Sequence, residues 1–383
     1  MLEILENRID AAHPFFQQIK RVKSEYVKTQ HFKNFSVQAF LQTQYTFTPL
    51  CCSSAKEGKQ LCIKNGAVEE FPKGVKISEL ENFNVDQNHF DALYYFSHSL
   101  VEKLIFIELD KDISFEIEHI VDESDNALSY RVVVQVGKSV HANIYENFSY
   151  EGVRQNKILY GVDVELLSSA DLTWVRGETL GENSLDILGS HSFCVKDHAS
   201  LELKSFDMGQ TDVLHIYKID LDEFSRADLA HLVFGTHKTK RGNIAQVHHN
   251  KAYAKSVQEA RTILHEKATG IFDSKITVAH DAKYSSAFQN SKAILLDSNA
   301  HMYAKPQLEI YTDELEASHG STIGSLDEDA LFYLCSRGIE VKKAKQILVS
   351  SFANTLIDAI SKPEFSKKVR ENFEQVYEKK DLL

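Results

Sequence analysis

Apolar and polar residues alternate through more than half of this chain, from about residue 110 to residue 320. The apolar members of the pattern include Ile113, Phe115 and Ile117, then Val132, Val134 and Val136, then Leu201 and Leu203. Successive side chains of a β-strand point to opposite faces, so the pattern predicts strands with one buried face. Helical spacing is scarce there, apart from a short helical turn predicted at 258–263. We therefore expect this region to be almost entirely β.

Four short segments within this region resemble one another. Each places a small residue at a corner and an apolar position within the next two residues; the small residues are Ala142, Ala170, Ala199 and Ala227, at steps of 28, 29 and 28 residues. A period between about 20 and 50 residues is typical of stacked repeats that share one core. The period favours a large β-helix coil over the shorter coil of hexapeptide repeats. Chance spacing in a β-sandwich is the alternative.

Helical spacing of apolar residues appears near the start of the chain. The residues of this pattern are Ile4, Leu5, Ile9, Phe16, Ile19 and Val22. Ser36 is a candidate cap for a second helix through Phe40 and Leu41. The segment 51–74 has no clear pattern. We divide the chain into a mixed helical domain at 1–100, a β-helix core at 101–324 and a helical domain at 325–383.

The last domain carries the clearest helix signals. Ser325 and Glu328 form a predicted capping box, and Gly338 is the predicted left-handed stop of that first helix. The predicted inward stripe of a second helix is Ala344, Ile347, Leu348, Phe352, Leu356 and Ala359. Pro363 opens a third helix, whose predicted inward residues are Phe365, Val369, Phe373 and Val376.

Charge and composition narrow the function. The net charge of −12 argues against nucleic-acid binding, which usually requires a basic face. No run of about 18 apolar residues predicts a membrane span, and the start lacks the apolar core of a signal peptide. The cysteines are five, irregularly spaced and without a Cys-x-x-Cys pair, which disfavours a disulfide framework. We predict a cytoplasmic protein.

Motifs of common enzymes are missing from the sequence. The run GTHKTK at 235–240 lacks the second glycine and the ending of a phosphate-binding loop. The adjacent His248 and His249 would point to opposite faces of a strand and cannot bind one metal together. Cys51, Cys52 and Cys62 are interpreted as small buried hydrophobes rather than as iron–sulfur ligands.

Polar residues with possible chemistry cluster at the end of the alternating region. They are Glu309, Asp313, Glu316 and His319, at predicted strand ends, and Gly320 follows the histidine, so that a backbone can approach closely there. The alternative interpretation of His319 is a histidine that hydrogen-bonds the last rung.

The same stretch resembles the SufB/SufD family of iron–sulfur cluster assembly proteins, and its SufD branch in particular. The matching runs are KPQLEIYTDELEASHGSTIG at 305–324, LFYLCSRGI at 331–339 and HHNKAYAKSVQEARTILHEKATGIFDSKI at 248–276. The His-Gly-Ser-Thr form at 319–322 is similar to SufD, whereas SufB typically has glutamate after that histidine. The similarity is strong over about 245–355 and looser over the rest of the alternating region.

The resemblance implies a right-handed parallel β-helix with helical parts at both ends. It implies a non-enzymatic scaffold subunit that pairs with SufB through the β-helices and binds the ATPase SufC, which would hydrolyse ATP. The family's functional histidine aligns with His319, which the resemblance places at the cluster-assembly interface with Glu316 and makes a candidate metal ligand. The SufC-docking residues that the resemblance suggests are Leu331, Phe332, Leu334, Arg337, Leu348 and Phe352.

One position departs from the family pattern. Members often carry cysteine two residues before the histidine, where this chain has Ala317, so the thiolates for a cluster would come from SufB. Cys335 stands where arginine is common and is interpreted as a packing residue. We expect no tightly bound cofactor, a transient iron–sulfur cluster at the SufB interface, and a possible homodimer of the chain alone; flavin binding stays open. The alternatives are a SufB-like self-associating scaffold and a β-helix enzyme that acts on polysaccharide.

Overall fold

The structure is a computed structural model, and it describes residues 35, 37–45, 55–81, 85–101, 103–123, 127–178 and 185–378. The helix predicted from Ile4 to Val22, the cap at Ser36 and the pair Cys51–Cys52 lie outside these residues. Helix α4 (Val37–Gln42) confirms the second helix predicted near the start. No helix in the described ranges is long and apolar enough to cross a membrane.

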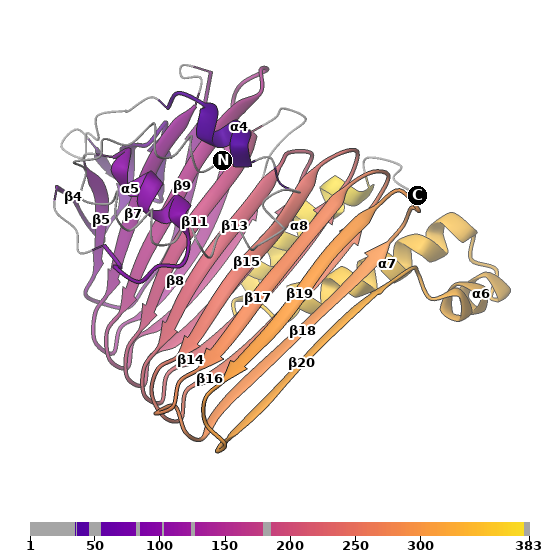
Figure 1. Cartoon of the computed structure of the whole chain (residues 1–383). Helices are drawn as coiled ribbons and strands as arrows, with labels where there is room; N and C mark the ends of the chain where they lie inside the picture. The colour runs from indigo at the N-terminus through magenta and orange to yellow at the C-terminus, as the bar shows by residue number, and fades with distance from the viewer. Residues whose placement is uncertain are drawn as a thin grey trace.

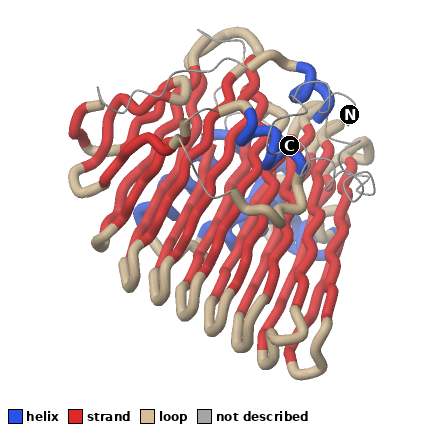
Figure 2. The backbone as a smooth tube through the Cα atoms, turned by 60° about the vertical axis from the view of Figure 1, so that its left-hand side comes forward, coloured by secondary structure: helices blue, strands red, loops and turns tan. Residues whose placement is uncertain are grey.

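The chain winds into a parallel β-solenoid of about seven turns, which confirms the mainly-β prediction (Figure 1). Each turn gives one strand to each of two facing sheets (Figure 2). Sheet A contains β5 (Leu104–Leu109), β7 (Leu128–Val136), β9 (Asn156–Leu166), β11 (Leu185–Val195), β13 (Val213–Leu221), β15 (Lys240–His249), β17 (Thr269–Val278) and β19 (His301–Ile310). Sheet B contains β6 (Ile113–Val121), β8 (His141–Tyr150), β10 (Asp171–Glu178), β12 (Ser200–Met208), β14 (Arg226–Gly235), β16 (Lys255–Leu264), β18 (Ser285–Leu295) and β20 (Leu315–Gly324).

The strand register shows how closely the sequence repeat matches the turns. Ala142 and Ala227 stand in one column with Leu172 and Leu201, whereas Ala170 and Ala199 come directly before β10 and β12, two residues earlier than that column. The turn length varies, from 26 residues between Leu201 and Ala227 to 32 between Thr269 and His301. The four alanines therefore mark the same corner but not one stacked position.

The helical turn predicted at 258–263 is wrong, because this segment lies within β16. Gln258, Ala260 and Thr262 are buried while the residues between them are more exposed. This two-residue alternation packs onto the neighbouring strands, and the tertiary pairing overrides the weak helical spacing.

One end of the solenoid is closed by short strands from the first part of the chain. These are β1 (Lys56–Gly58), β2 (Leu61–Lys64), β3 (Ala67–Pro72) and β4 (Lys76–Leu80). Strand β2 pairs with β6 and β4 pairs antiparallel with β5, so both sheets continue upstream of residue 101. The unpatterned segment at 51–74 thus contributes strands, and the described part of 1–100 is not mainly helical.

Helix α5 (Ala92–Ser99) packs on the outer face of sheet A over β7, β9 and β11 (Figure 1). Asp91 caps it by accepting a hydrogen bond from the Leu93 backbone N–H at 2.9 Å. Buried Arg131 binds Asp163 at 2.9 and 3.1 Å and donates to the Ser97 hydroxyl at 2.6 Å. Burial alone would raise the pKa of Asp163, but the Arg131 guanidinium holds it well below its ordinary value.

The C-terminal helices are α6 (Glu328–Ser336), α7 (Val341–Ile357) and α8 (Pro363–Glu378), and the last two pack on the outer face of sheet B. Burial of Phe365, Val369 and Phe373 confirms the predicted inward face of α8. The predicted stripe of α7 is confirmed at Ala344 and Leu356 only; the other buried residues of the helix are Val349, Ala353 and Ile357.

The predicted capping box of α6 is also wrong. The cap is Asp327, whose carboxylate accepts from the Ala330 backbone N–H at 2.9 Å. Gly338 does end the helix, with a φ of 87°. The Gly338 and Ile339 N–H groups bond back to the carbonyls of Cys335 and Leu334, the paired pattern of a Schellman motif.

Buried polar groups fill part of the space between the sheets. Glu146, which is 1% exposed, accepts hydrogen bonds from Trp174 Nε1 at 2.8 Å, from His119 Nε2 at 3.1 Å and from the Tyr160 hydroxyl. Tyr130 donates in turn to His119 Nδ1 at 2.7 Å. Burial would raise the pKa of Glu146, but His119 and the other neighbours lower it below its usual value. A satisfied network of this kind fixes one packing arrangement.

Buried neutral histidines make the stability depend on pH. Burial lowers the pKa of His231 to about 3 and of His249 to about 4, from an ordinary 6.5. Between these pH values the histidines of the unfolded chain bind protons, whereas those of the folded chain stay neutral. The free energy of unfolding therefore falls as the pH drops from 6.5 to about 4. Each such histidine adds up to about 1.4 kcal/mol per pH unit to this slope.

We expect His231→Gln to reduce the slope of unfolding free energy against pH in that window, measured by urea denaturation. His280→Gln is the matched control, because the His280 side chain is 85% exposed and should not change the slope. Equal slopes for the His231→Gln variant and the wild type would contradict this account.

Candidate functional site

The solenoid ends in a turn that no other described element covers. Among the described strands, β19 pairs only with β17 and β20 only with β18, so that no described strand covers their other edges. The end exposes four large apolar side chains, which are Tyr303, Ile310, Tyr311 and Ile323. We call β19, β20 and the turn 311–314 the terminal rung. Native proteins usually cover long free strand edges, because the edges invite pairing with another chain.

The structure places His319 and Glu316 on opposite faces of β20. Leu315 and Ala317 pack against the core, so odd-numbered positions here face the space between the sheets. His319 shares this face and stacks on the buried Gln289 of β18, whereas Glu316 is exposed on the outer face. The two side chains that the sequence analysis grouped therefore cannot bind one ion together.

His319 stands at the mouth of the solenoid. Its side chain is exposed because no further rung follows, and it forms no hydrogen bond or ion pair with the residues that the structure describes. A hollow of about 300 Å³ is lined by residues of β16, β18 and β20, including Gln258, Gln289 and His319. The imidazole is therefore available to a group that approaches the open end.

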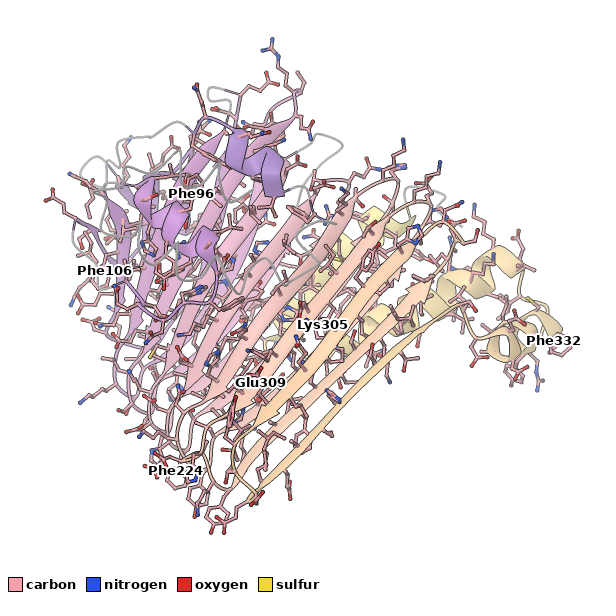
Figure 3. The ribbon with its side chains drawn as sticks, viewed as in Figure 1. Phe96, Phe106, Phe224, Lys305, Glu309 and Phe332 are labelled. Carbon is pink, nitrogen blue, oxygen red and sulfur yellow. The ribbon has the colours of Figure 1, made fainter. Side chains whose placement is uncertain are left out.

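The other polar residues of this region belong to sheet A. Glu309 lies on the outer face of β19 with Lys305 (Figure 3) and pairs with Lys275 at 3.2 Å. Gln307 donates to Asp273 at 3.0 Å on the same face. Asp313 lies in the exposed turn between β19 and β20. None of these carboxylates shares a face with His319, so the structure separates residues that the sequence places within eleven positions.

The proposed docking residues on α6 are accessible. The helix projects from the end of the solenoid (Figures 1 and 3), and none of its residues is buried. Phe332 is 75% exposed, Arg337 is exposed, and Leu331 and Leu334 are half-buried. Tyr333, which the sequence analysis did not single out, is 57% exposed and packs under Arg337.

The two docking candidates on α7 are less free. Leu348 is half-buried, and so is Phe352, whose ring lies 4.8 Å from the Arg261 guanidinium of β16. Arg261 also donates to the Phe352 carbonyl at 3.1 Å. Phe352 therefore holds α7 on sheet B, and replacing it would disturb the helix as well as any partner surface.

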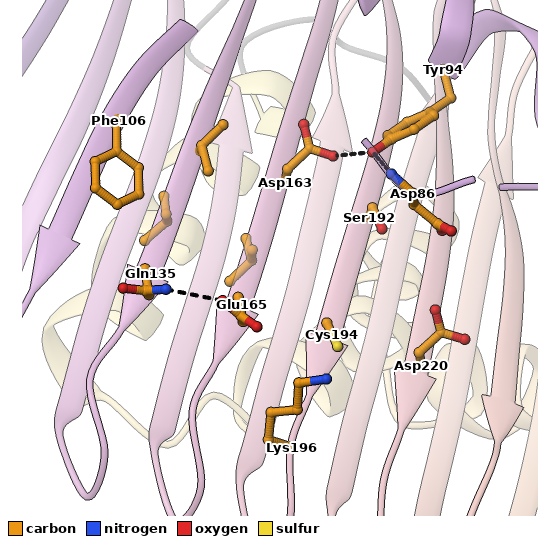
Figure 4. Close-up of a pocket in the computed structure, with 13 residues that line it drawn as sticks. Asp86, Tyr94, Phe106, Gln135, Asp163, Glu165, Ser192, Cys194, Lys196 and Asp220 are labelled. Atoms are coloured by element: carbon orange, nitrogen blue, oxygen red, sulfur yellow. Dashed lines mark hydrogen bonds between the residues drawn. The ribbon is translucent and has the colours of Figure 1, made fainter. Parts of the chain in front are cut away.

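A second hollow, of about 340 Å³, lies on the outer face of sheet A (Figure 4). It contains Cys194 and Lys196, and Gln135 donates to Glu165 at 3.0 Å at its edge. Burial raises the pKa of the Cys194 thiol, and Lys196 also pairs with Asp222 at 3.5 Å. The thiol is therefore protonated at neutral pH and is a poor nucleophile.

The described ranges contain no cluster of metal-binding side chains. No three His, Cys, Asp or Glu side chains there are placed to hold one ion. Burial and the nearby Glu69 raise the pKa of Cys62 to about 11, as befits a buried thiol. His248 is half-exposed and His249 fully buried on the opposite face of β15, as the sequence predicted.

Comparison with known proteins points to one family. The family model described as "SUF system FeS cluster assembly, SufBD core domain" matches residues 119–352, more than half of the chain. The chain is 38% identical over 112 residues to the iron-sulfur cluster assembly protein SufD of Escherichia coli strain K12. The aligned residues are 29% of this chain and 26% of that protein. It is 22% identical over 309 residues to SufD of Bacillus subtilis strain 168, covering 78% of this chain and 61% of that protein.

A third relative is a SufBD family protein of Synechocystis, 32% identical over 122 residues, or 32% of this chain and 27% of that protein. The matched segments thus span less than two thirds of the length of each of these relatives. The family model runs from within β6, through the rest of the solenoid and α6, and ends within α7.

The geometry predicts that the chain alone offers iron a single imidazole, that of His319, on the inward face of the terminal rung; His301 lies on the outer face of β19. One monodentate ligand binds a metal weakly compared with a site of three or four donors. We expect anaerobic equilibrium dialysis with Fe(II) to give the same bound iron for the wild type and for His319→Ala. Loss of a tightly bound equivalent in the variant would show that further ligands do converge on His319.

Proposed function

This chain belongs to the SufB/SufD family as a SufD-type member, and from this premise we propose that it is a scaffold subunit for iron–sulfur cluster assembly. It pairs with SufB through the open end of the solenoid, binds the ATPase SufC through its C-terminal helices, and does no catalysis of its own. The observation that carries the proposal is the uncovered terminal rung with His319 at its mouth.

The free edges of β19 and β20 suit a partner of the same architecture. Each edge is ten residues long, presents backbone groups that pair with no described strand, and is flanked by the exposed side chains of Tyr303 and Ile323. A second solenoid could continue both sheets by adding its own terminal strands, which gives main-chain hydrogen bonds and apolar contact at once. A SufB subunit would supply such an end, and a second copy of this chain would be its substitute when SufB is absent.

The iron–sulfur cluster is the cargo of this interface. His319 offers one nitrogen, which suits iron, but thiolates are the usual ligands of these clusters. Ala317 faces the same side two residues earlier and has no donor atom. The partner would therefore provide the sulfur ligands, and the cluster would be held transiently between the two chains.

Helix α6 provides the surface for SufC. Phe332, Tyr333 and Val341 expose large apolar side chains at the α6–α7 hairpin, with Arg337 beside them. Aromatic and arginine side chains are the residues that most often dominate binding at protein interfaces. Absence of a phosphate-binding loop in the sequence agrees with nucleotide hydrolysis by the partner.

Hydrogen bonds connect α7 and the segment after it to strands of sheet B, so a movement of α6 and α7 would be transmitted to the solenoid. Arg261 of β16 binds the α7 backbone at Phe352, and Lys204 of β12 donates to the Ala359 carbonyl after α7. Strand β16 in turn pairs with β18, which pairs with β20. We propose that nucleotide hydrolysis at SufC shifts these helices and thereby the terminal rung.

For the interface, we expect His319→Ala to leave the complex intact but to lower its cluster content. An exposed side chain contributes little to strand pairing, whereas its nitrogen would contact iron. The measurement is anaerobic co-expression with SufB and SufC, with complex recovery and iron–sulfur absorbance compared between wild type and variant. Full cluster content in the variant would place the chemistry wholly in SufB. Failure of the wild-type chain to bind SufB would contradict the proposed pairing.

For SufC binding, we expect Phe332→Glu to weaken affinity by at least about tenfold, since a charge would replace an apolar anchor. Val153→Glu is the matched control, because Val153 is 82% exposed between β8 and β9, away from α6. Binding is measured by titration calorimetry. Unchanged affinity of the Phe332 variant would remove α6 from the docking surface.

A further inference from the structure

The inward column that ends at His319 changes its chemistry in the last rungs. Counted from the closed end, its first five members are the buried apolar residues Phe115, Ile144, Trp174, Leu203 and Leu229. The next two members are glutamines, Gln258 and Gln289, and the last is His319. Burying an amide where an apolar side chain would pack costs free energy unless its hydrogen bonds are made. The two glutamines are therefore not explained by core packing.

Hydrogen bonds orient the glutamines in one direction. The Ser274 hydroxyl, from β17 across the space between the sheets, donates to Gln258 Oε1. Gln289 Nε2 donates to the same oxygen at 2.9 Å. This use of its amide nitrogen leaves Gln289 Oε1 as the free acceptor of the side chain. Gln289 is only 3% exposed, and its Oε1 is inaccessible to solvent. This buried oxygen nevertheless has no hydrogen-bond partner among the described residues.

The nearest rung above this acceptor carries His319. The two residues are direct partners in the β18–β20 register, and both line the same hollow. A neutral imidazole has one N–H and one nitrogen with a lone pair. If the N–H is given to Gln289 Oε1, the lone pair is left on the other nitrogen, which faces the open end.

We propose that Gln289, held in place by Gln258, is a positioning residue for His319. When the His319 ring turns toward this unpartnered oxygen, the Gln289 carbonyl accepts the imidazole N–H, selects one tautomer of the ring and presents the other nitrogen to iron at the partner interface. Histidines that bind metals commonly donate their second nitrogen to such an acceptor, and loss of the acceptor typically lowers metal affinity or activity about 10- to 100-fold. The inference rests on the proposed role of His319 in cluster assembly.

Nitrogen-15 NMR of the chain alone tests the tautomer without any cluster. At about pH 8, above the ordinary pKa of histidine, the wild type should show one protonated and one unprotonated His319 ring nitrogen, assigned by their loss in His319→Gln. Gln289→Leu should give averaged shifts from two tautomers, and Gln289→Glu, which keeps an acceptor, should restore one. Ser291→Ala is the control, because Ser291 is the next inward residue of β18 and is buried. A mixture in the wild type, or an unchanged single tautomer in Gln289→Leu, overturns the proposal.

The second readout is cluster content of the complex with SufB and SufC. We expect Gln289→Leu to lower it about tenfold, with recovery in Gln289→Glu and no change in Ser291→Ala. Normal content in Gln289→Leu despite a changed tautomer overturns the positioning role. If the wild-type complex builds no cluster, the proposed function fails, while the NMR result still decides whether Gln289 orients His319.

Discussion

Parallel pairing of each turn with the next is the constraint on which this structure depends. Because the register partners in neighbouring turns are 26 to 32 positions apart, the same strand position recurs in the same place from turn to turn. Side chains are thereby sorted into columns that run along the solenoid. Apolar members of a column pack on one another, whereas a polar member costs free energy unless it finds a hydrogen-bond partner. The shape of the core, the covered faces and the open end all follow from this stacking.

The first and last strands of a stack each have an edge without a neighbouring turn, and the two ends of this solenoid differ in how that edge is treated. At the closed end, antiparallel pairing of β4 with β5 and of β2 with β3 stops the repeat within the chain. At the other end, β19 and β20 have edges that no described strand covers, exposed apolar side chains and a histidine in the inward column. Helices cover the outer faces but not this end. The asymmetry is what makes a partner solenoid the natural completion of the fold.

Sequence patterns predicted the features that depend on local spacing. Alternation marked the strands, Gly338 marked the end of α6, and the stripe through Phe365, Val369 and Phe373 marked the inward face of α8. Features that depend on which surfaces meet were missed. The buried face of α7 is shifted because it packs on strands of sheet B, and β1 to β3 show no pattern because they are short.

The site was predicted in part. The resemblance singled out His319, but it grouped it with Glu316, and a strand places residues three apart on opposite faces. Gln258 and Gln289 were not noticed, because nothing local distinguishes them from surface glutamines. Their meaning depends on the register, which places them under His319 and above Leu229. The signal in the sequence that could have identified them is their spacing, because Gln258, Gln289 and His319 follow one another at steps of about one solenoid turn.

The claim that a SufB-type solenoid completes the open end is tested most directly by amide hydrogen exchange. Exchange of residues 301–310 and 315–324 is followed for the chain alone and for its complex with SufB. The account predicts that the amides on the free edges exchange quickly in the chain alone and slow strongly in the complex, while those of β9 and β11 are unchanged. A stable complex in which the edge amides of β19 and β20 exchange as fast as before would contradict it.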